Sequence, residues 1–367
     1  MIKVLVIDEF GGFSSVRLVN DFARAGAQVY LLREFTFQVP LPRGAVLLPP
    51  ESLALPDRLT AIDRAVKELQ PDAVIPMDEP TLLQIWENRP AWLNLVQPRI
   101  DMEKLSLYGD KRQMEELARS VGLPLPETYQ PEAVDTPETR DRIAALGLPV
   151  VVKGIGGCMG EQVRIVESVA DAQRAIAELY RDTGVLPAVQ QFIGGAPYQS
   201  GGLFDKGRPV RFLTGEKIAI HPPRTGPAIA LTSESVPELL DYGRTIMTAL
   251  EFSGLAGIDF IRGTDDRFYF LEVNPRIWGS YGLARSLGID LFGAWCRQIE
   301  GETLDTDTTF PVGKSWAKMP EYVLTYPQSR FSLLRRLCRP IALKSLAWSQ
   351  PSLLYHQWRR IGWALRK

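Results

Sequence analysis

This chain of 367 residues has only three cysteines and two histidines, and its net charge is close to zero. The cysteine content and the net charge each exclude a class of protein. The three cysteines, Cys158, Cys296 and Cys338, show neither a close pair nor the spacing of a metal site. Their odd number argues against a disulfide framework and indicates a reducing compartment. Because the net charge is −1, the chain as a whole does not bind nucleic acid by neutralising phosphates.

Long apolar runs are also missing, since no uncharged stretch approaches the roughly 18 residues that a membrane-spanning helix needs. The first ten residues carry Lys3, Asp8 and Glu9, which is not the pattern of a secretory signal. A cytoplasmic location is therefore expected.

Acidic residues stop after Glu321, so the segment 322–367 is basic. On a helix, Leu354, Trp358, Ile361 and Leu365 would share one face, with basic residues elsewhere. Such a helix is typical of contact with an acidic membrane surface or partner. The same apolar stripe could instead dock on the body of the protein, and both readings stay open.

The N-terminal third alternates buried strands with amphipathic helices. Residues 2–7 and 27–32 read as strands on either side of a helix that ends near Ala25, and the pattern recurs over 59–77. Strand, helix and strand in this order favour a parallel sheet with right-handed crossovers. The loop after the first strand lacks GxGxxG, so it favours a structural turn over a nucleotide-binding loop.

The character of the sequence changes near residue 101. A single helical stretch is expected over 101–123, followed by a strand hairpin over 149–168 with a long glycine-rich tip. Lys153 ends the first strand of this hairpin. Glycines at the tip would let backbone N–H groups approach phosphate oxygens, although a mobile tip beside a solvated lysine is the simpler alternative. Cys158 in this tip reads as an incidental small residue.

A second hairpin, over 254–276, carries the most chemistry. With the turn centred on Thr264–Asp265, strand alternation places Asp259, Glu272 and Asn274 on one face. The opposite face would be core: Ile258, Phe260, Tyr269, Leu271 and Val273. Two carboxylates and an amide oxygen suit Mg²⁺ held together with substrate phosphates. Arg276 follows, with a planar fork suited to an anion.

Taken together, these motifs resemble the ATP-grasp superfamily, in the branch that includes carbamoyl phosphate synthetase, biotin carboxylase and many carboxylate–amine ligases. The resemblance runs in order from residue 1 to about 295. It rests on five motifs: GDK (109–111), PVVVKGIGGCMG (149–160), QQFIGG (190–195), GIDF (257–260) and LEVNPR (271–276).

The resemblance implies an α/β fold with three parts: a doubly wound pre-ATP-grasp domain (1–105), an ATP-grasp domain (106–300) and a C-terminal extension (301–367), basic after 321. Within the ATP-grasp domain, a small lid subdomain would cover about 113–192, and the metal and acyl-phosphate subdomain about 193–300.

The resemblance also implies a role for each matching position. The residues expected to contact ATP are Lys111, Lys153, Gly156, Gly157, Gly160, Gln190, Gln191, Phe192 and Ile193. Asp259, Glu272 and Asn274 would bind Mg²⁺, with Mn²⁺ as a substitute. Arg276 and Lys153 would act in catalysis. Two departures stand out: the hinge lacks its usual ribose-binding acid over 196–199, and Asp259 replaces the commoner Glu.

The expected activity is an ATP-dependent ligase that activates a carboxylate as an acyl phosphate and couples it to an amine. A small-molecule kinase and a non-catalytic ATP-binding partner subunit stay open as alternatives, as does a homodimer. Biotin carboxylase itself is disfavoured, because the segment after NPRIWGS departs from its pattern. Four residues outside the ATP roles are candidates for substrate contact: Tyr198, Arg224, Trp278 and Ser280.

Overall fold

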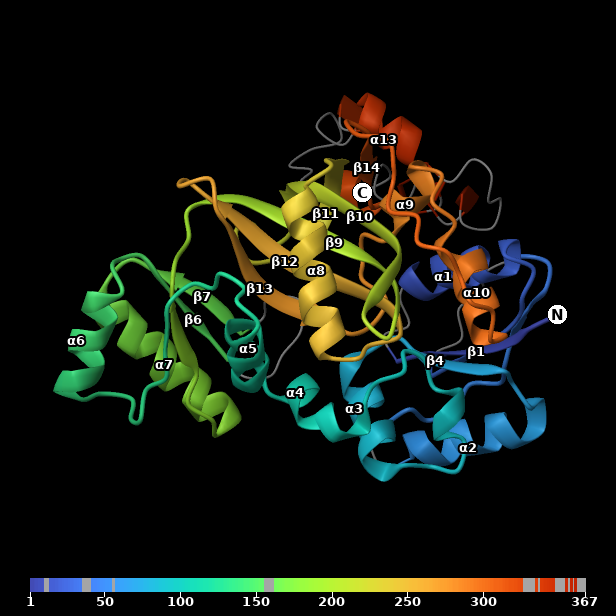
Figure 1. Ribbon diagram of the computed structural model, residues 1–367, viewed down its shortest axis with the longest axis horizontal. Helices are drawn as coiled ribbons and strands as arrows, with labels where there is room; N and C mark the ends of the chain where they lie inside the picture. Colours follow the sequence, from blue (N-terminus) through green and yellow to red (C-terminus); the bar gives the residue numbers. More distant parts are fainter. Residues whose placement is uncertain are drawn as a thin grey trace.

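The computed structural model describes residues 1–9, 13–34, 41–54, 57–154 and 162–325. In the C-terminal stretch it describes residues 334–335, 337–346, 354–355, 357–358 and 360–361. Three β-sheets organise these residues, one in each of three successive parts of the chain (Figure 1).

The first sheet is parallel, in the order β3-β2-β1-β4. Its strands are β1 (Lys3–Asp8), β2 (Gln28–Arg33), β3 (Ala45–Leu47) and β4 (Ala73–Pro76). The helices of this part are α1 (Phe13–Arg24), α2 (Arg58–Leu69) and α3 (Glu79–Asn88). Helix α1 joins two neighbouring parallel strands, so the expected strand–helix–strand unit is present. Buried strands of this kind are covered by helices on both faces.

The second sheet is the centre of the molecule, in the order β13-β12-β9-β10-β11-β14 (Figure 1). Its strands are β9 (Gly195–Asp205), β10 (Arg208–Ile220), β11 (Ala228–Ser233), β12 (Gly254–Gly263), β13 (Phe268–Asn274) and β14 (Ser315–Ala317). All its pairings are antiparallel. Helix α8 (Pro237–Ala249) packs on β9 and β10. Apolar side chains of this helix share one core with Phe212 of β10 and Phe260 of β12.

Helices α9 (Gly282–Ser286) and α10 (Leu291–Ile299) follow the second sheet's last long strand. Helix α10 contacts both β9 and α1, so it joins the central sheet to the first one. Trp295 of α10 is 1% exposed and packs against Phe22 of α1 with ring centroids 5.3 Å apart. The N-terminal and central parts therefore share continuous apolar cores.

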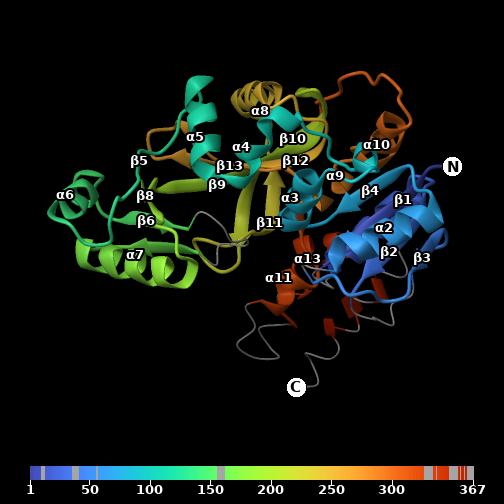
Figure 2. The same ribbon diagram turned by 90° about the horizontal axis from the view of Figure 1, so that it is seen from below.

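The third sheet stands apart from the first, at the far end of the long axis (Figures 1 and 2). Its order is β5-β8-β6-β7, with strands β5 (Thr128–Tyr129), β6 (Val150–Lys153), β7 (Val163–Val166) and β8 (Ala188–Gln191). Helices α6 (Pro137–Ala145) and α7 (Val169–Thr183) pack together in this part. It has a core of its own, which includes Ile143, Val152 and Ile176.

The segment expected to be one helix over 101–123 is broken in the structure. A 3₁₀ turn at Met102–Lys104 leads into α4 (Leu105–Gly109), and α5 (Lys111–Ser120) begins afresh. Asp110 lies between them in an extended conformation, and its side chain accepts a hydrogen bond from the Arg112 N–H. Asp at this position satisfies a free N–H of the first turn. The prediction of a continuous helix was wrong, and the break sets the direction of Lys111.

The C-terminal stretch packs against the outer edge of the central sheet. Helices α11 (Glu321–Leu324) and α13 (Pro340–Ser345) follow β14. A core cluster joins Ile229 of β11 to Val323 and Ile361. Ile361 is fully buried and Leu354 is partly buried against the same cluster, whereas Trp358 is 40% exposed. Docking on the body thus occupies part of the predicted apolar stripe. Within the described part of the chain, no helix is long and apolar enough to cross a membrane.

Candidate ATP-binding and metal site

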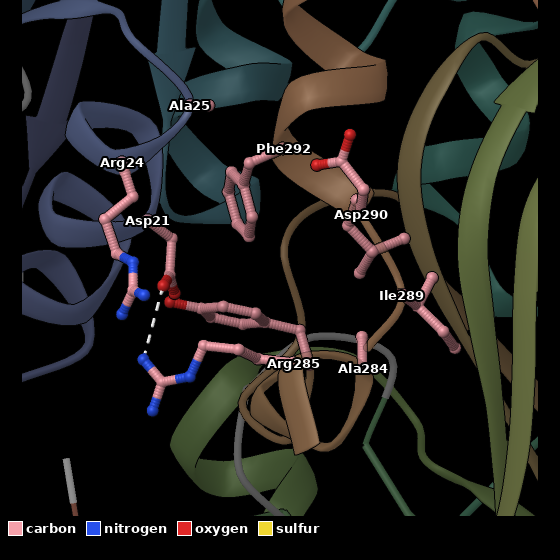
Figure 3. Close-up of a pocket in the computed structure, with 10 residues that line it drawn as sticks. Asp21, Arg24, Ala25, Ala284, Arg285, Ile289, Asp290 and Phe292 are labelled. Carbon is pink, nitrogen blue, oxygen red and sulfur yellow. Dashed lines mark hydrogen bonds and ion pairs between the residues drawn. The ribbon is translucent and has the colours of Figure 1, made fainter. Parts of the chain in front are cut away.

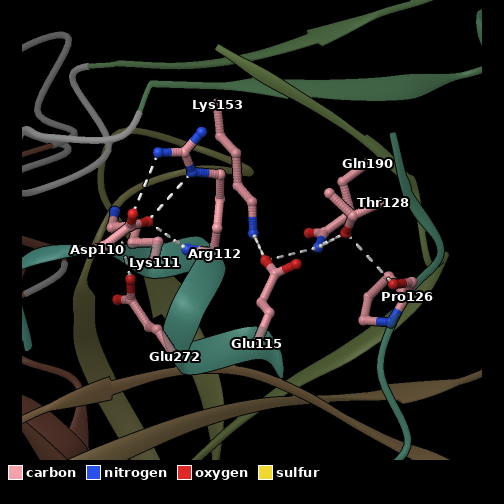
Figure 4. Close-up of polar contacts among 9 residues, drawn as sticks. All are labelled: Asp110, Lys111, Arg112, Glu115, Pro126, Thr128, Lys153, Gln190 and Glu272. Atoms are coloured by element: carbon pink, nitrogen blue, oxygen red, sulfur yellow. Dashed lines mark hydrogen bonds and ion pairs between the residues drawn. The ribbon is translucent and has the colours of Figure 1, made fainter. Parts of the chain in front are cut away.

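Lys153 ends β6 and turns toward α5, where its ammonium group donates a hydrogen bond to the Glu115 carboxylate (Figure 4). Both side chains are largely buried, at 14% and 11% exposed. The Gln190 amide lies 3.3 Å from Glu115 Oε1 and donates to Thr128 Oγ1 at 2.8 Å. Sequence reasoning missed Glu115. A carboxylate on the buried side of a predicted helix could have indicated that Glu115 has a cationic partner.

The described residues around Lys153 leave a cavity of only about 10 Å³. Its lining includes Lys111, Glu115, Lys153 and Gly154. That volume accommodates about one water, and a triphosphate is far larger. In this conformation the described side chains around Lys153 therefore fill most of the space beside its ammonium group. The predicted phosphate contacts Gly156, Gly157 and Gly160 lie outside the described residues.

Lys111 occupies the first position of α5, directly after the capping Asp110. Its ammonium lies 3.7 Å from Glu272 Oε2 of β13, and both side chains are partly exposed (Figure 4). The structure thus brings together the GDK and LEVNPR motifs, which are more than 150 residues apart in the sequence. The amino end of a helix also favours anions, because its first N–H groups are unpaired.

Strands β12 and β13 pair with Asp259 directly opposite Glu272, so these two side chains lie on one face, as the sequence predicted. The register then shifts, so that Phe260 pairs with Phe270 and Leu271 is an extra residue in a bulge. Because a bulge reverses the alternation, Phe268 and Phe270 are buried in place of the predicted Tyr269 and Leu271. That part of the prediction was wrong, while Glu272 and Asn274 keep a common face.

Asp259 has two partners, one on the adjacent strand β9 and one on β10, the strand beyond it. The Lys217 ammonium of β10 lies 2.9 Å from Asp259 Oδ1, and the Gln199 amide of β9 donates to the same oxygen at 2.9 Å. The Ser280 hydroxyl in turn donates to Gln199 Oε1. Lys217 is only 8% exposed and was missed by sequence reasoning, since nothing local marks it.

The two paired carboxylates differ in their acidity. Burial and the neighbouring Glu272 raise the pKa of Asp259, despite the opposing effect of Lys217. Burial also acts to raise the pKa of Glu272, but Lys111, Lys217 and the hydrogen bond from Asn274 outweigh it, and the pKa falls below its usual value. Glu272 is therefore the group that stays anionic most readily.

Arg276 is linked to Glu272 through Asn274. The guanidinium Nη2 donates to Asn274 Oδ1 at 3.3 Å, and the Asn274 amide donates to Glu272 Oε1 at 3.3 Å. Glu79, the first residue of α3, faces this row from the N-terminal part of the chain. Burial raises its pKa, and the Arg276 charge opposes that effect. Glu79 was not anticipated from the sequence.

The donor atoms on this face are all oxygens, from Asp259, Glu272 and Asn274. No group of three or more His, Cys, Asp or Glu side chains that could hold a metal occurs in the described ranges. Two carboxylates and one amide are too few to enclose an ion, but they suit Mg²⁺ that takes its remaining ligands from phosphates and water. Since Lys217 and Gln199 already engage Asp259 Oδ1, Glu272 and Asn274 are the better placed pair.

The predicted hinge connects the third sheet to the central one. Gln191 pairs with Glu127 through its backbone N–H at 2.8 Å. The Arg224 guanidinium lies over the Phe192 ring, 5.5 Å from its centroid, and 4.0 Å from Glu167. The structure therefore places Arg224 beside the stretch 190–193, which the resemblance predicts to contact ATP.

The other three substrate candidates are buried. Tyr198 is 2% exposed and donates to Glu234 Oε2 at 2.5 Å, Trp278 is 3% exposed, and Ser280 is 2% exposed. Tyr198 also packs edge-on against Phe268. Their side chains therefore stabilise the core and the Gln199 contact in this conformation, and present little surface to a substrate.

An acid that follows the carboxyl end of β1, Glu9, gives a test of the electrostatics of the N-terminal part of the chain. Burial, with Asp78 nearby, raises the pKa of Glu9 from 4.5 to about 8, while Arg58 opposes the shift. The folded protein then binds a proton that the unfolded chain releases, so stability is full below pH 4.5 and declines as pH rises to about 8. We expect Glu9→Gln to remove this decline, worth up to about 5 kcal/mol.

Urea unfolding of both proteins between pH 5 and pH 9 measures the effect. The exposed Glu251→Gln is the matched control, and its stability should fall with pH as the wild type does. Parallel pH profiles for wild type and Glu9→Gln would contradict the assignment.

The chain is similar to known proteins in sequence and in fold. Residues 108–280 match the model of the ATP-grasp domain family. A 102-residue stretch is 31% identical to the arginine-specific large chain of carbamoyl phosphate synthase from Geobacillus stearothermophilus, covering 28% of this chain and 10% of that protein. A 90-residue stretch is 36% identical to D-alanine–D-alanine ligase from Desulforudis audaxviator, covering 24% of this chain and 29% of that protein. The chain thus spans less than a third of the length of either relative.

Among solved structures, the fold is similar to a biotin carboxylase–βγ-ATP complex from Campylobacter jejuni. The TM-score is 0.68 at 16% identity, over 86% of this chain and 74% of that one. At this identity the likeness establishes the fold, which is the ATP-grasp fold that the motifs predicted.

Proposed function

The chain contains an ATP-grasp domain at residues 108–280, and from that premise we propose that it is an ADP-forming ligase. It would use ATP and Mg²⁺ to activate a small-molecule carboxylate as an acyl phosphate, which an amine then attacks. One observation carries the proposal: Lys111, Glu272, Asn274 and Arg276 form a continuous polar row from the head of α5 to the end of β13. Such a row offers both cations and oxygen ligands to the outer phosphates of ATP.

Each side chain in the row meets a physical requirement of phosphoryl transfer. A carboxylate and a γ-phosphate repel each other, so cations must offset the charge that gathers where they meet. Lys111 and Lys153 would neutralise phosphate oxygens, and Arg276 would hold the transferred group. Glu272 and Asn274 would hold Mg²⁺, which neutralises phosphate charge when bound. The same oxygens would accept Mn²⁺.

Lys153 must exchange partners during this cycle. In the structure its ammonium is bonded to Glu115, and a phosphate would compete with that carboxylate. Opening of the third sheet would admit ATP, and closure would exclude water from the acyl phosphate. We propose that the parts follow the boundaries of the sequence: a lid over about 113–192 and the metal-binding part over about 193–300.

A kinase and a non-catalytic ATP-binding subunit are the alternatives. The polar row argues against a non-catalytic protein, because an inactive site has no need of paired metal ligands. A kinase would release a phosphorylated small molecule as its final product. The proposal is tested by measuring ADP release with pairs of carboxylates and amines, and by identifying each product by mass spectrometry. ADP formation that needs both substrates, with a condensed product, supports the ligase.

Replacing Arg276 by alanine should separate binding from transfer. Its guanidinium contacts Asn274 and the Ile277 carbonyl. We expect Arg276→Ala to keep the ATP dissociation constant within about threefold while turnover falls by a hundredfold or more, the loss typical of one electrostatic stabiliser. Nucleotide titration and steady-state kinetics measure the two effects, with the exposed Arg244→Ala as the control. A mutant that loses ATP affinity and turnover in equal measure would count against this role.

We propose that the apolar stripe of the basic C-terminal stretch docks on the body of the protein, and contact with an acidic membrane surface is the alternative. With Ile361 buried and Leu354 partly buried, Trp358 is the described member of the stripe that stays exposed. Flotation with vesicles containing anionic lipid tests the contact, and Trp358→Ser is the informative variant. We expect the protein to stay at the bottom of the gradient. Flotation of the wild type that is lost in Trp358→Ser would instead establish a membrane contact.

A further inference from the structure

A second cavity lies between α1 and the segment that follows the LEVNPR motif (Figure 3). Its volume is about 250 Å³. The residues that line it are Asp21, Arg24, Ala25, Tyr281, Ala284, Arg285, Ile289, Asp290, Leu291 and Phe292. None of them belongs to the polar row described above. Small-molecule sites begin at roughly 300 Å³, so this cavity suits a ligand of amino-acid size.

The charged side chains that line the cavity balance each other. Asp21 and Arg285 lie 3.5 Å apart, one on α1 and the other on α9 (Figure 3). Arg24 lies on the same side, whereas Asp290 lies across Phe292, where it caps α10 through the Gly293 N–H. Because the lining has two arginines and two aspartates, its net charge is zero, and a singly charged ligand would not be favoured. A ligand with one charge of each sign fits this lining.

Tyr281 lies where the charged and the apolar parts of the lining meet. Its side chain is 3% exposed, and its hydroxyl faces the Asp21 carboxylate. The ring packs edge-on against Phe292, with centroids 5.4 Å apart. Tyr281 therefore joins the charged rim of the cavity at Asp21 to its apolar wall, and its hydroxyl can also bond to a ligand held there.

We propose that this cavity binds a small zwitterion of the α-amino acid class. The ligand's carboxylate pairs with Arg24 and Arg285 at the mouth, where both arginines are exposed. Its ammonium group meets Asp21 or Asp290, and its apolar side chain lies against Phe292 and Ile289. The Tyr281 hydroxyl hydrogen-bonds to the bound molecule. This site takes no nucleotide and is distinct from the ATP-binding site.

The test measures binding of single free L-amino acids to the full chain without nucleotide, by thermal shift and then by calorimetry. We expect at least one apolar amino acid to raise Tm and bind with a measurable Kd. Its amine and carboxylic acid analogues, each lacking one charge, should bind at least tenfold more weakly. No shift with any amino acid, or equal binding of an analogue, overturns the proposal.

Two variants place the binding in this cavity. Tyr281→Phe removes the hydroxyl that faces Asp21 and keeps the packing of the ring on Phe292, so the protein should stay folded while the ligand-induced shift is lost. Arg285→Gln should weaken binding about tenfold or more. Lys153→Met should bind the amino acid normally, which separates this site from the proposed ATP site. Undiminished binding in both cavity variants overturns the assignment, whatever the outcome for ATP turnover.

Discussion

Lys153→Met is expected to abolish ATP turnover while the protein stays folded. Methionine keeps most of the length and apolar stem of lysine, so packing against α5 is largely preserved. The charge is lost where the outer phosphates would lie, next to Glu115. An uncompensated Glu115 would then repel the nucleotide as well, since a buried carboxylate without its partner is costly. We expect turnover to fall by at least about a thousandfold, from loss of one stabilising cation and gain of one repulsion.

The measurement is steady-state ADP formation, with circular dichroism and Tm as checks on folding. Lys67→Met is the matched control, because Lys67 forms an exposed ion pair on the surface of α2. A second variant, Glu115→Gln, removes the repulsion but keeps Lys153, and we expect it to retain most of the activity. Full wild-type turnover in Lys153→Met would contradict the proposal that Lys153 contacts the phosphates of ATP.

Glu272→Gln should lower kcat by two or more orders of magnitude and raise the Mg²⁺ concentration needed for half-maximal activity. Glutamine has nearly the same shape, and it can still accept a hydrogen bond from Asn274. The lost charge, however, is the one that the surrounding lysines keep ionised. Without it, Lys111 loses its ion-pair partner and the metal loses an anionic ligand.

A Mg²⁺ titration at saturating ATP separates the two effects, since excess metal should restore part of the activity if Glu272 is a ligand. Asn274→Ala should behave in the same way, and the exposed Glu251→Gln should not. If Glu272→Gln keeps the wild-type Mg²⁺ dependence, then Glu272 does not hold the metal.

Local sequence patterns predicted much of this arrangement. Strand alternation correctly placed Glu272 and Asn274 on one face, because side chains two apart in a strand point the same way. The strand–helix–strand unit of the N-terminal part followed from short apolar runs on either side of an amphipathic helix. The predicted core residues Tyr269 and Leu271 were wrong because the strand register shifts at a bulge. The bulge at Leu271 depends on how two strands pair, so the sequence of one strand does not reveal it.

The missed residues share a different cause. Glu115 reaches Lys153 from 38 residues away, and Lys217 reaches Asp259 across β9. Glu79 approaches Arg276 and Glu272 from α3, almost 200 residues earlier in the sequence. Contacts of this kind are created by tertiary packing, so no spacing within one motif could reveal them. Arg224 likewise reaches Phe192 only because two loops meet beside the hinge.

Transfer of ¹⁸O tests the central claim most directly, once a carboxylate and an amine that support ADP formation are found. The carboxylate is labelled with ¹⁸O, and the products of a complete reaction are separated. An acyl phosphate passes one carboxylate oxygen to phosphate when the amine displaces it. The account predicts ADP as the nucleotide product, with ¹⁸O in the inorganic phosphate. Formation of AMP, with ¹⁸O absent from inorganic phosphate, would contradict it.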